Sequence, residues 1–344
     1  MSLGTNQERH GDEPMRFTHV NGSRRISETI KSCLNEQPAR SGMYNWIFAL
    51  KGEINTFWSV KDRLEDFDVI QVNMSPQDFE TVLEIRRRLK NSSTKLVINN
   101  DYVCEKWNDW GISPYLYDNI QRAGDMVFGT EPHQVSNMID GTFCIPHPTN
   151  TKWVKRLGTD AYDDAIGFVF HWWAGETYLP HRTIEKVKAK YGVEKAKIYG
   201  YKEQWDKNSQ AKKLMWDTIC PLDDFTNYAE RVQGDKILYD PNPMHTYGRN
   251  GVEMACWKKP VVGSNRVFSY NKLIPELTCD PYDFRETMKR FDLVFNHPDK
   301  VAEIMDRAYK EVEWFNYKNS VARFKEALEI ATDRGGHKWY GQQS

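Results

Sequence analysis

The residues best suited to chemistry lie between Tyr247 and Asn265, where the chain reads Y-G-R-N-G-V-E-M-A-C-W-K-K-P-V-V-G-S-N. Gly248 and Gly251 allow the backbone to approach a ligand closely, and a helix that begins here would offer its free N–H groups to an anion. Glu253 projects from the first turn of that helix, where its carboxylate accepts hydrogen bonds from hydroxyl groups. The stretch therefore predicts a site for a ligand with phosphate and hydroxyl groups, such as a nucleotide-sugar, and its candidate donor-binding residues are Tyr247, Arg249, Asn250, Gly251, Val252 and Glu253.

Further polar residues follow predicted strands in the second half of the chain. His171 ends a strand expected at 165–171, and Tyr201-Lys202 ends the next one. Parallel sheets present their ligand loops at the carboxyl ends of the strands. His171 is thus a candidate contact for a phosphate or a sugar, and Lys202 is a candidate to neutralise a pyrophosphate; a solvated lysine is the alternative interpretation.

The first half of the chain offers two positions of the same kind. Gly22 lies in a turn after the first expected strand, where it could meet a phosphate of the nucleotide-sugar donor or the molecule that accepts the sugar. Asp101 follows the strand expected at 95–99 and is the carboxylate best placed there to act as a general base in an inverting reaction. An Asp at such a position also caps loops, so a structural role is the competing interpretation.

The elements that must position these residues alternate between strand and helix, which is typical of parallel sheets covered on both faces. We expect an α/β fold of two Rossmann-like parallel-sheet domains facing a cleft. The predicted parts are a disordered leader (1–14), an N-terminal acceptor domain (15–150), a C-terminal nucleotide-sugar domain (160–320), and a C-terminal helix and tail (321–344). The expected strands are 16–20, 44–50, 68–73, 95–99, 125–129, 165–171, 196–201, 236–239 and 260–263, and the segment 143–150 is expected to be a short strand that runs into a connector. The expected helices are 23–36, 56–64, 75–90, 180–191, 208–215, 224–233, 282–291, 298–312 and 318–331.

Composition narrows the class of protein. At 344 residues the chain suits two domains, and its formal charge of −1 disfavours general nucleic-acid binding. The six cysteines are widely spaced without a C-x-x-C pair, which favours a reduced protein without a zinc site or disulfide framework. No apolar run reaches the length of a membrane span, and the N-terminus lacks a secretory signal pattern. We expect a cytoplasmic location, with peripheral membrane attachment left open.

Segments in the same order as in a known family carry a resemblance. They are M-R-F-T-H-V-N from Met15, K-L-V-I-N-N-D from Lys95, A-G-D-M-V-F-G-T-E from Ala123, I-P-H-P-T-N-T from Ile145, and the stretch from Tyr247. Together they resemble the GT-B glycosyltransferases, and most closely the retaining family 4, also called glycosyl transferases group 1. In that comparison Glu253 falls on the family glutamate, which implies a contact with the ribose hydroxyls of the donor.

The resemblance implies a hexosyltransferase that needs no metal and no cofactor, uses a UDP- or GDP-linked sugar as co-substrate, and retains the anomeric configuration. The acceptor stays open among a glycan, a lipid-linked sugar, a small molecule and a modified base, and so does the oligomeric state. One departure concerns the family's paired glutamates, which lie eight residues apart: His245 stands at the first position. Its imidazole is a candidate to bind a sugar hydroxyl or a donor phosphate, with an exposed loop histidine as the alternative.

Two other functions fit the same pattern. One is a nucleotide-sugar 2-epimerase on the same scaffold, which would need acidic residues around the sugar ring. The other is a protein directed to nucleic acid, for example one that glycosylates a modified DNA base, or a binding protein without catalysis. Nucleotide binding would separate the enzymes from a scaffold protein.

Overall fold

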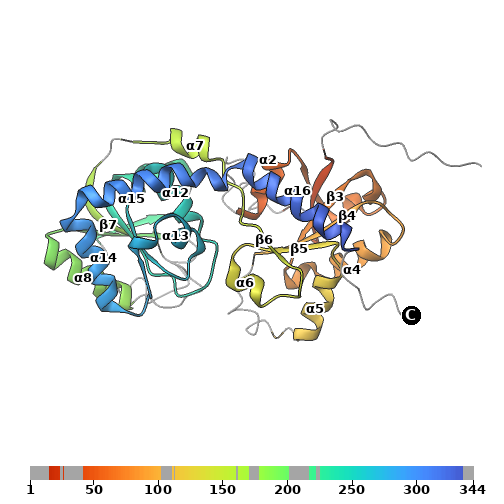
Figure 1. Ribbon diagram of the computed structural model, residues 1–344, viewed down its shortest axis with the longest axis horizontal. Coiled ribbons are helices and arrows are strands. Elements are labelled where there is room, and N and C mark those ends of the chain that lie inside the picture. The colour runs from red at the N-terminus through yellow and green to blue at the C-terminus, as the bar shows by residue number, and fades with distance from the viewer. Residues whose placement is uncertain are drawn as a thin grey trace, which may run out of the picture.

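The computed structural model describes residues 15–23, 26, 42–101, 111, 113–159, 162–169, 178–200, 217–221 and 225–335. Figure 1 shows these residues as two lobes side by side, each built around one sheet. Both sheets have six strands, and every pair of neighbouring strands is parallel. The expected α/β fold with two parallel-sheet domains is therefore confirmed.

The first sheet has the order β2-β1-β3-β4-β5-β6. Its strands are β1 (Phe17–Asn21), β2 (Glu53–Thr56), β3 (Val69–Asn73), β4 (Lys95–Asn100), β5 (Met126–Gly129) and β6 (Phe143–Cys144). The helices between them are α2 (Asn45–Ala49), α3 (Phe57–Val60), α4 (Phe79–Arg88), α5 (Pro114–Arg122) and α6 (Pro132–Ser136), with short 3₁₀ turns η1 (Gly42–Tyr44), η2 (Leu64–Asp66) and η3 (Pro76–Asp78).

The second sheet has the order β12-β11-β10-β7-β8-β9. Its strands are β7 (Asp163–Val169), β8 (Lys195–Gly200), β9 (Thr218–Pro221), β10 (Asp235–Asp240), β11 (Val261–Ser264) and β12 (Thr278–Cys279). Its helices are α7 (Thr151–Arg156), α8 (Tyr178–Tyr191), α11 (Phe225–Gly234), α12 (Arg249–Trp257), α13 (Phe268–Leu273), α14 (Phe284–Asn296) and α15 (Pro298–Glu311), with 3₁₀ turns η7 (Pro275–Leu277) and η8 (Val312–Phe315).

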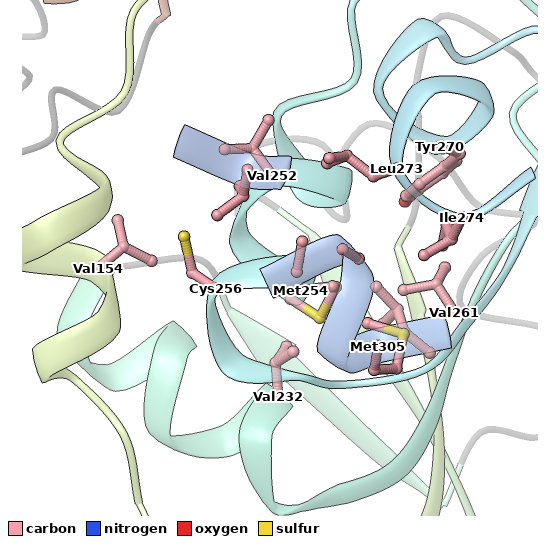
Figure 2. Packing of buried hydrophobic residues seen from close by; sticks show 14 of the residues in the cluster. Val154, Val232, Val252, Met254, Cys256, Val261, Tyr270, Leu273, Ile274 and Met305 are labelled. Atoms are coloured by element: carbon pink, nitrogen blue, oxygen red, sulfur yellow. The ribbon is translucent and has the colours of Figure 1, made fainter. Parts of the chain in front are cut away.

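Both faces of each sheet are covered, because side chains alternate along a strand between two apolar cores. In the first sheet Val20, Ile70 and Ile98 pack in the core that includes α4 and α5, whereas Phe17 and Val97 pack in the core on the other face. In the second domain, α12 forms the centre of the larger core (Figure 2), where its Val252, Met254 and Cys256 lie in one cluster with residues of α7, α13 and α15. This burial fixes the orientation of α12 on the sheet.

The last helix, α16 (Tyr317–Asp333), crosses from the second lobe back onto the first (Figure 1). Phe324 of α16 contacts the rings of Phe17, Trp46 and Phe128 in the first domain. The first connection between the domains is the connector 145–150, which leaves β6. The chain that returns to the first domain runs beside it, because the Thr149 amide donates to the Phe315 carbonyl oxygen at 2.8 Å. The two connections between the domains are therefore hydrogen-bonded to each other.

The strand expected at 44–50 is wrong. This segment forms η1 and α2, and the second strand of the sheet in sequence is β2, farther along the chain. Trp46, Ile47 and Leu50 are buried in the core against α16, a spacing that a helix places on one face. Packing against a helix from the far end of the chain thus outweighs the strand preference of this short apolar run.

A buried histidine in β1 makes stability depend on pH. His19 is 1% exposed, its ring nitrogens lie 3.4 and 3.5 Å from the side-chain amides of Gln71 and Asn73, and burial lowers its pKa from 6.5 to about 4. Because the pKa of His19 is lower in the folded state, its contribution to the free energy of unfolding is fully present above pH 6.5 and is lost as the pH falls towards 4. The loss is about 3 kcal/mol, at ~1.4 kcal/mol per pKa unit. We expect His19→Gln to flatten the dependence of the thermal unfolding midpoint on pH between 4 and 6.5.

The exposed His297 supplies the matched control for this measurement. His297→Gln should leave the slope of the wild-type protein unchanged. An equally steep slope in His19→Gln would show that other groups cause the acid sensitivity.

Candidate functional site

The start of α12 is shaped by a glycine. Gly248 precedes the helix with a φ of +73°, and a Cβ atom there would lie 2.0 Å from Cγ1 of Val267. Both features demand glycine. Among the described residues no side chain caps the helix, and the Gly251 amide donates to the Gly248 carbonyl oxygen at 3.1 Å. The positive end of the helix dipole favours an anion at this end.

Glu253 and Arg249 form a buried ion pair one turn apart on α12. The Arg249 Nε lies 2.5 Å from Oε1 of Glu253, whose side chain is fully buried, while Arg249 is one-fifth exposed. Burial raises the pKa of Glu253, and the neighbouring Arg249 opposes that shift. The guanidinium also lies over the ring of Phe225. The glutamate therefore sits beneath the arginine, and Arg249 is the more accessible of the two charges.

The other donor-binding candidates on α12 pack within the second domain. Asn250 donates from Nδ2 to Oδ2 of Asp240 at 3.3 Å, and Val252 is fully buried in the core. A Cβ atom on Gly251 would lie 2.2 Å from the Ser269 hydroxyl oxygen, so this glycine allows α13 to approach. These three residues have local packing reasons for their identity.

Asp240 is a structural anchor that the sequence analysis did not single out. It ends β10, is 2% exposed, and its Oδ2 accepts a hydrogen bond from the Tyr270 hydroxyl at 2.7 Å as well as the one from Asn250. The carboxylate thereby ties the start of α12 to α13. Its signal in the sequence was an acidic residue directly after the apolar strand I-L-Y.

The loop before α12 contacts the first domain. The ring of His245 stacks on His133 of α6, with centroids 3.7 Å apart and planes at 12°. Tyr247 is buried, and its hydroxyl donates to the carbonyl oxygen of His147 in the connector at 3.2 Å. Because His133 follows β5 and His245 follows β10, the carboxyl edges of the two sheets face each other at these contacts.

Asp101 and Gly22 lie at the carboxyl edge of the first sheet. Oδ1 of Asp101 is 2.8 Å from Nε2 of His147, a residue without an assigned role in the sequence analysis. The Gly22 amide donates to Oδ1 of Asp78 at 2.8 Å, and burial raises the pKa of that carboxyl group. Asp78 thus holds the turn after β1 in place.

The structure brings together, at the interface of the domains, Asp101, Tyr247, His245 and the start of α12. Three predicted residues, His171, Tyr201 and Lys202, lie outside the described residues. His133 and His147 were missed as candidates, because neither follows a strand directly and their neighbours are far away in the sequence.

The architecture of this chain is similar to that of several solved structures. A sucrose-phosphate synthase from Thermosynechococcus elongatus matches with a TM-score of 0.65 at 12% identity, covering 93% of this chain and all of that one. An α-glucosyltransferase solved with UDP and a 13-mer DNA matches with a TM-score of 0.58 at 12% identity, covering 92% of this chain and all of that one. The fold is that of the GT-B glycosyltransferases.

TarM, another glycosyltransferase, matches with a TM-score of 0.56 at 14% identity over 76% of this chain, which spans 54% of TarM's length. No protein-family model matches the sequence, and no curated protein does. At these identities the comparisons establish the fold.

No helix of the described residues is both long enough and apolar enough to span a bilayer.

Proposed function

We propose that the protein is a glycosyltransferase that moves a hexose from a UDP-linked sugar to a hydroxyl-bearing acceptor. The observation that carries the proposal is the start of α12, an uncapped helix end with Arg249 beside it, set where the carboxyl edges of two parallel sheets meet. Ligands of open α/β sheets bind at such edges. The likeness to solved glycosyltransferases supports the same assignment.

The charges at this site suit the departure of a diphosphate. As the bond between the anomeric carbon and the phosphate oxygen lengthens, negative charge grows on the diphosphate. The N-terminus of α12 and the guanidinium of Arg249 are fixed in advance to stabilise that charge. In this proposal protein groups take the part that a metal plays elsewhere, and the second domain binds the donor while the first binds the acceptor.

The sugar must then be protected from water. We propose that movement of the domains around the contacts of His245 and Tyr247 closes the site, which limits hydrolysis of the donor. The resemblance of the 247–263 segment to family 4 supports retention of the anomeric configuration. Analysis of the product anomer by proton NMR tests this point, and an inverted product would turn attention to Asp101 as a base.

Nucleotide binding gives the first test. We expect UDP and UDP-glucose to raise the thermal unfolding midpoint, since a ligand at 100 times its Kd adds about 2.7 kcal/mol of stability. GDP and ADP at the same concentration serve as controls for base selectivity. No shift with any nucleotide or nucleotide-sugar would contradict the proposed function and favour a role without catalysis.

Turnover gives the second test. Release of UDP from UDP-glucose should be measured alone and with neutral sugars, glycans, and DNA that carries hydroxymethylated bases. The DNA arm is included because a neighbour of this fold was solved with DNA. Epimerisation of the sugar without release of UDP would favour the epimerase instead.

A further inference from the structure

His147 joins the two halves of the candidate site. It lies in the connector between the domains and is 2% exposed. Its Nε2 is 2.8 Å from Oδ1 of Asp101, at the carboxyl end of β4. A Cβ atom on Gly42 would lie 2.7 Å from Cδ2 of the imidazole. The ring is therefore closely walled on the side of the first domain and has little freedom to turn away from Asp101.

The second domain meets the same residue from the other side. The ring of Tyr247 packs edge-on against the imidazole, with centroids 5.7 Å apart and planes at 90°. The Tyr247 hydroxyl donates to the His147 carbonyl oxygen at 3.2 Å and lies 3.5 Å from the hydroxyl of Thr149. Tyr247 directly precedes Gly248, the residue before α12. Tyr247 thus links the segment before α12 to His147.

The chemistry of the contact matters as well as its shape. The Asp101 side chain is 23% exposed, whereas the imidazole that lies against its carboxylate is almost fully buried. Both ring nitrogens are buried, and neither makes a hydrogen bond of good geometry among the described residues, although Nε2 lies close to Asp101. A ring held only for packing would be served as well by a phenyl group, which would leave no buried nitrogen without a partner.

We propose that His147 is a positioning residue that sets the carboxylate of Asp101 relative to the donor-binding start of α12. The inference rests on the proposed function, because it takes Asp101 to face the transferred sugar or its acceptor. His147 touches neither substrate. It acts by holding Asp101 with its side chain and Tyr247 with its backbone carbonyl.

Two substitutions separate positioning from packing. His147→Phe keeps a ring and removes both nitrogens, whereas His147→Gln keeps an N–H donor that can reach Asp101. We expect His147→Phe to lower kcat for transfer from UDP-glucose by about 100-fold while KM for the donor changes by less than about threefold, the size of effect seen when a supporting contact is lost. His147→Gln should recover activity to within about tenfold of wild type.

A double variant tests whether His147 acts through Asp101. Asp101→Asn alone should lower kcat because it removes the carboxylate, and adding His147→Phe should lower kcat little further, because no carboxylate is then left to position. The matched control is His297→Phe, at an exposed position in the second domain, which should leave kcat and KM unchanged. Equal losses in the Phe and Gln variants of His147, or additive losses with Asp101→Asn, would overturn the positioning role.

The outcomes also separate this inference from the proposed function. Wild-type protein that neither binds UDP nor releases it from UDP-glucose contradicts the function itself. Wild-type protein that turns over normally, with His147→Phe unaffected, contradicts only the role of His147. If His147→Phe does not fold, the comparison of His147→Gln with Asp101→Asn decides, since a positioning role predicts a much smaller loss of kcat in the former.

Discussion

Replacing Glu253 with glutamine should reduce the affinity for UDP by about tenfold or more, which corresponds to a loss of ~1.4 kcal/mol. The carboxylate is fully buried and lies 2.5 Å from the Nε of Arg249. Glutamine keeps the shape of the side chain but removes the charge that holds the guanidinium. Without it, Arg249 is no longer fixed beside the uncapped start of α12, where we propose that the diphosphate binds. Isothermal titration with UDP measures the effect directly.

The same change affects folding, so a control is needed. A buried ion pair that loses one partner costs about 3–5 kcal/mol, and glutamine, which still accepts a hydrogen bond, should cost less than alanine. Glu286→Gln removes a partly exposed carboxylate that pairs with Lys289 on α14 and should leave UDP binding unchanged. Glu253→Gln protein that is folded and binds UDP with wild-type affinity would remove this residue from the donor site.

Replacing Gly248 with alanine should destabilise the second domain by about 3 kcal/mol. The left-handed φ of +73° costs an alanine ~1–2 kcal/mol, and the added Cβ atom would lie 2.0 Å from Val267, an overpacking that costs about 1–3 kcal/mol. The start of α12 must shift to relieve this contact. We therefore expect a lower unfolding midpoint together with loss of the stabilisation by UDP.

Gly192 offers a matched comparison. Its φ is +67°, and a Cβ atom there would meet nothing within 4 Å. Gly192→Ala should thus cost only the backbone term, about 1 kcal/mol, and leave UDP binding intact. Adding Val267→Ala to Gly248→Ala should restore part of the loss if the contact is the cause. Equal destabilisation by the two glycine substitutions would show that Val267 plays no part.

Local patterns were enough to locate most elements. Strands such as β3 and β4 are short apolar runs between turn residues, and helices such as α14 and α16 have a repeating apolar face and an Asp or Asn cap. The segment at 44–50 was assigned wrongly because its burial depends on α16, which lies near the other end of the sequence. A window of ten residues contains no information about such a partner.

The sequence likewise predicted one part of the candidate site and not the other. The sequence indicated the loop and helix from Tyr247 because glycines, a glutamate and a P-V-V strand occur at fixed spacing there. It gave no sign that Asn250 and Gly251 pack against Asp240, Tyr270 and Ser269.

By itself, the sequence determined two parallel α/β sheets and the stretch at which the second presents its helix N-terminus, because strand period, turn residues and caps are properties of neighbouring residues. Only the tertiary structure decided that His147 meets Asp101 and Tyr247, that His245 stacks on His133, and that Glu253 lies beneath Arg249. The physical reason is that these contacts depend on how the two domains and their helices pack, and burial and proximity across domains leave no periodic trace along the chain.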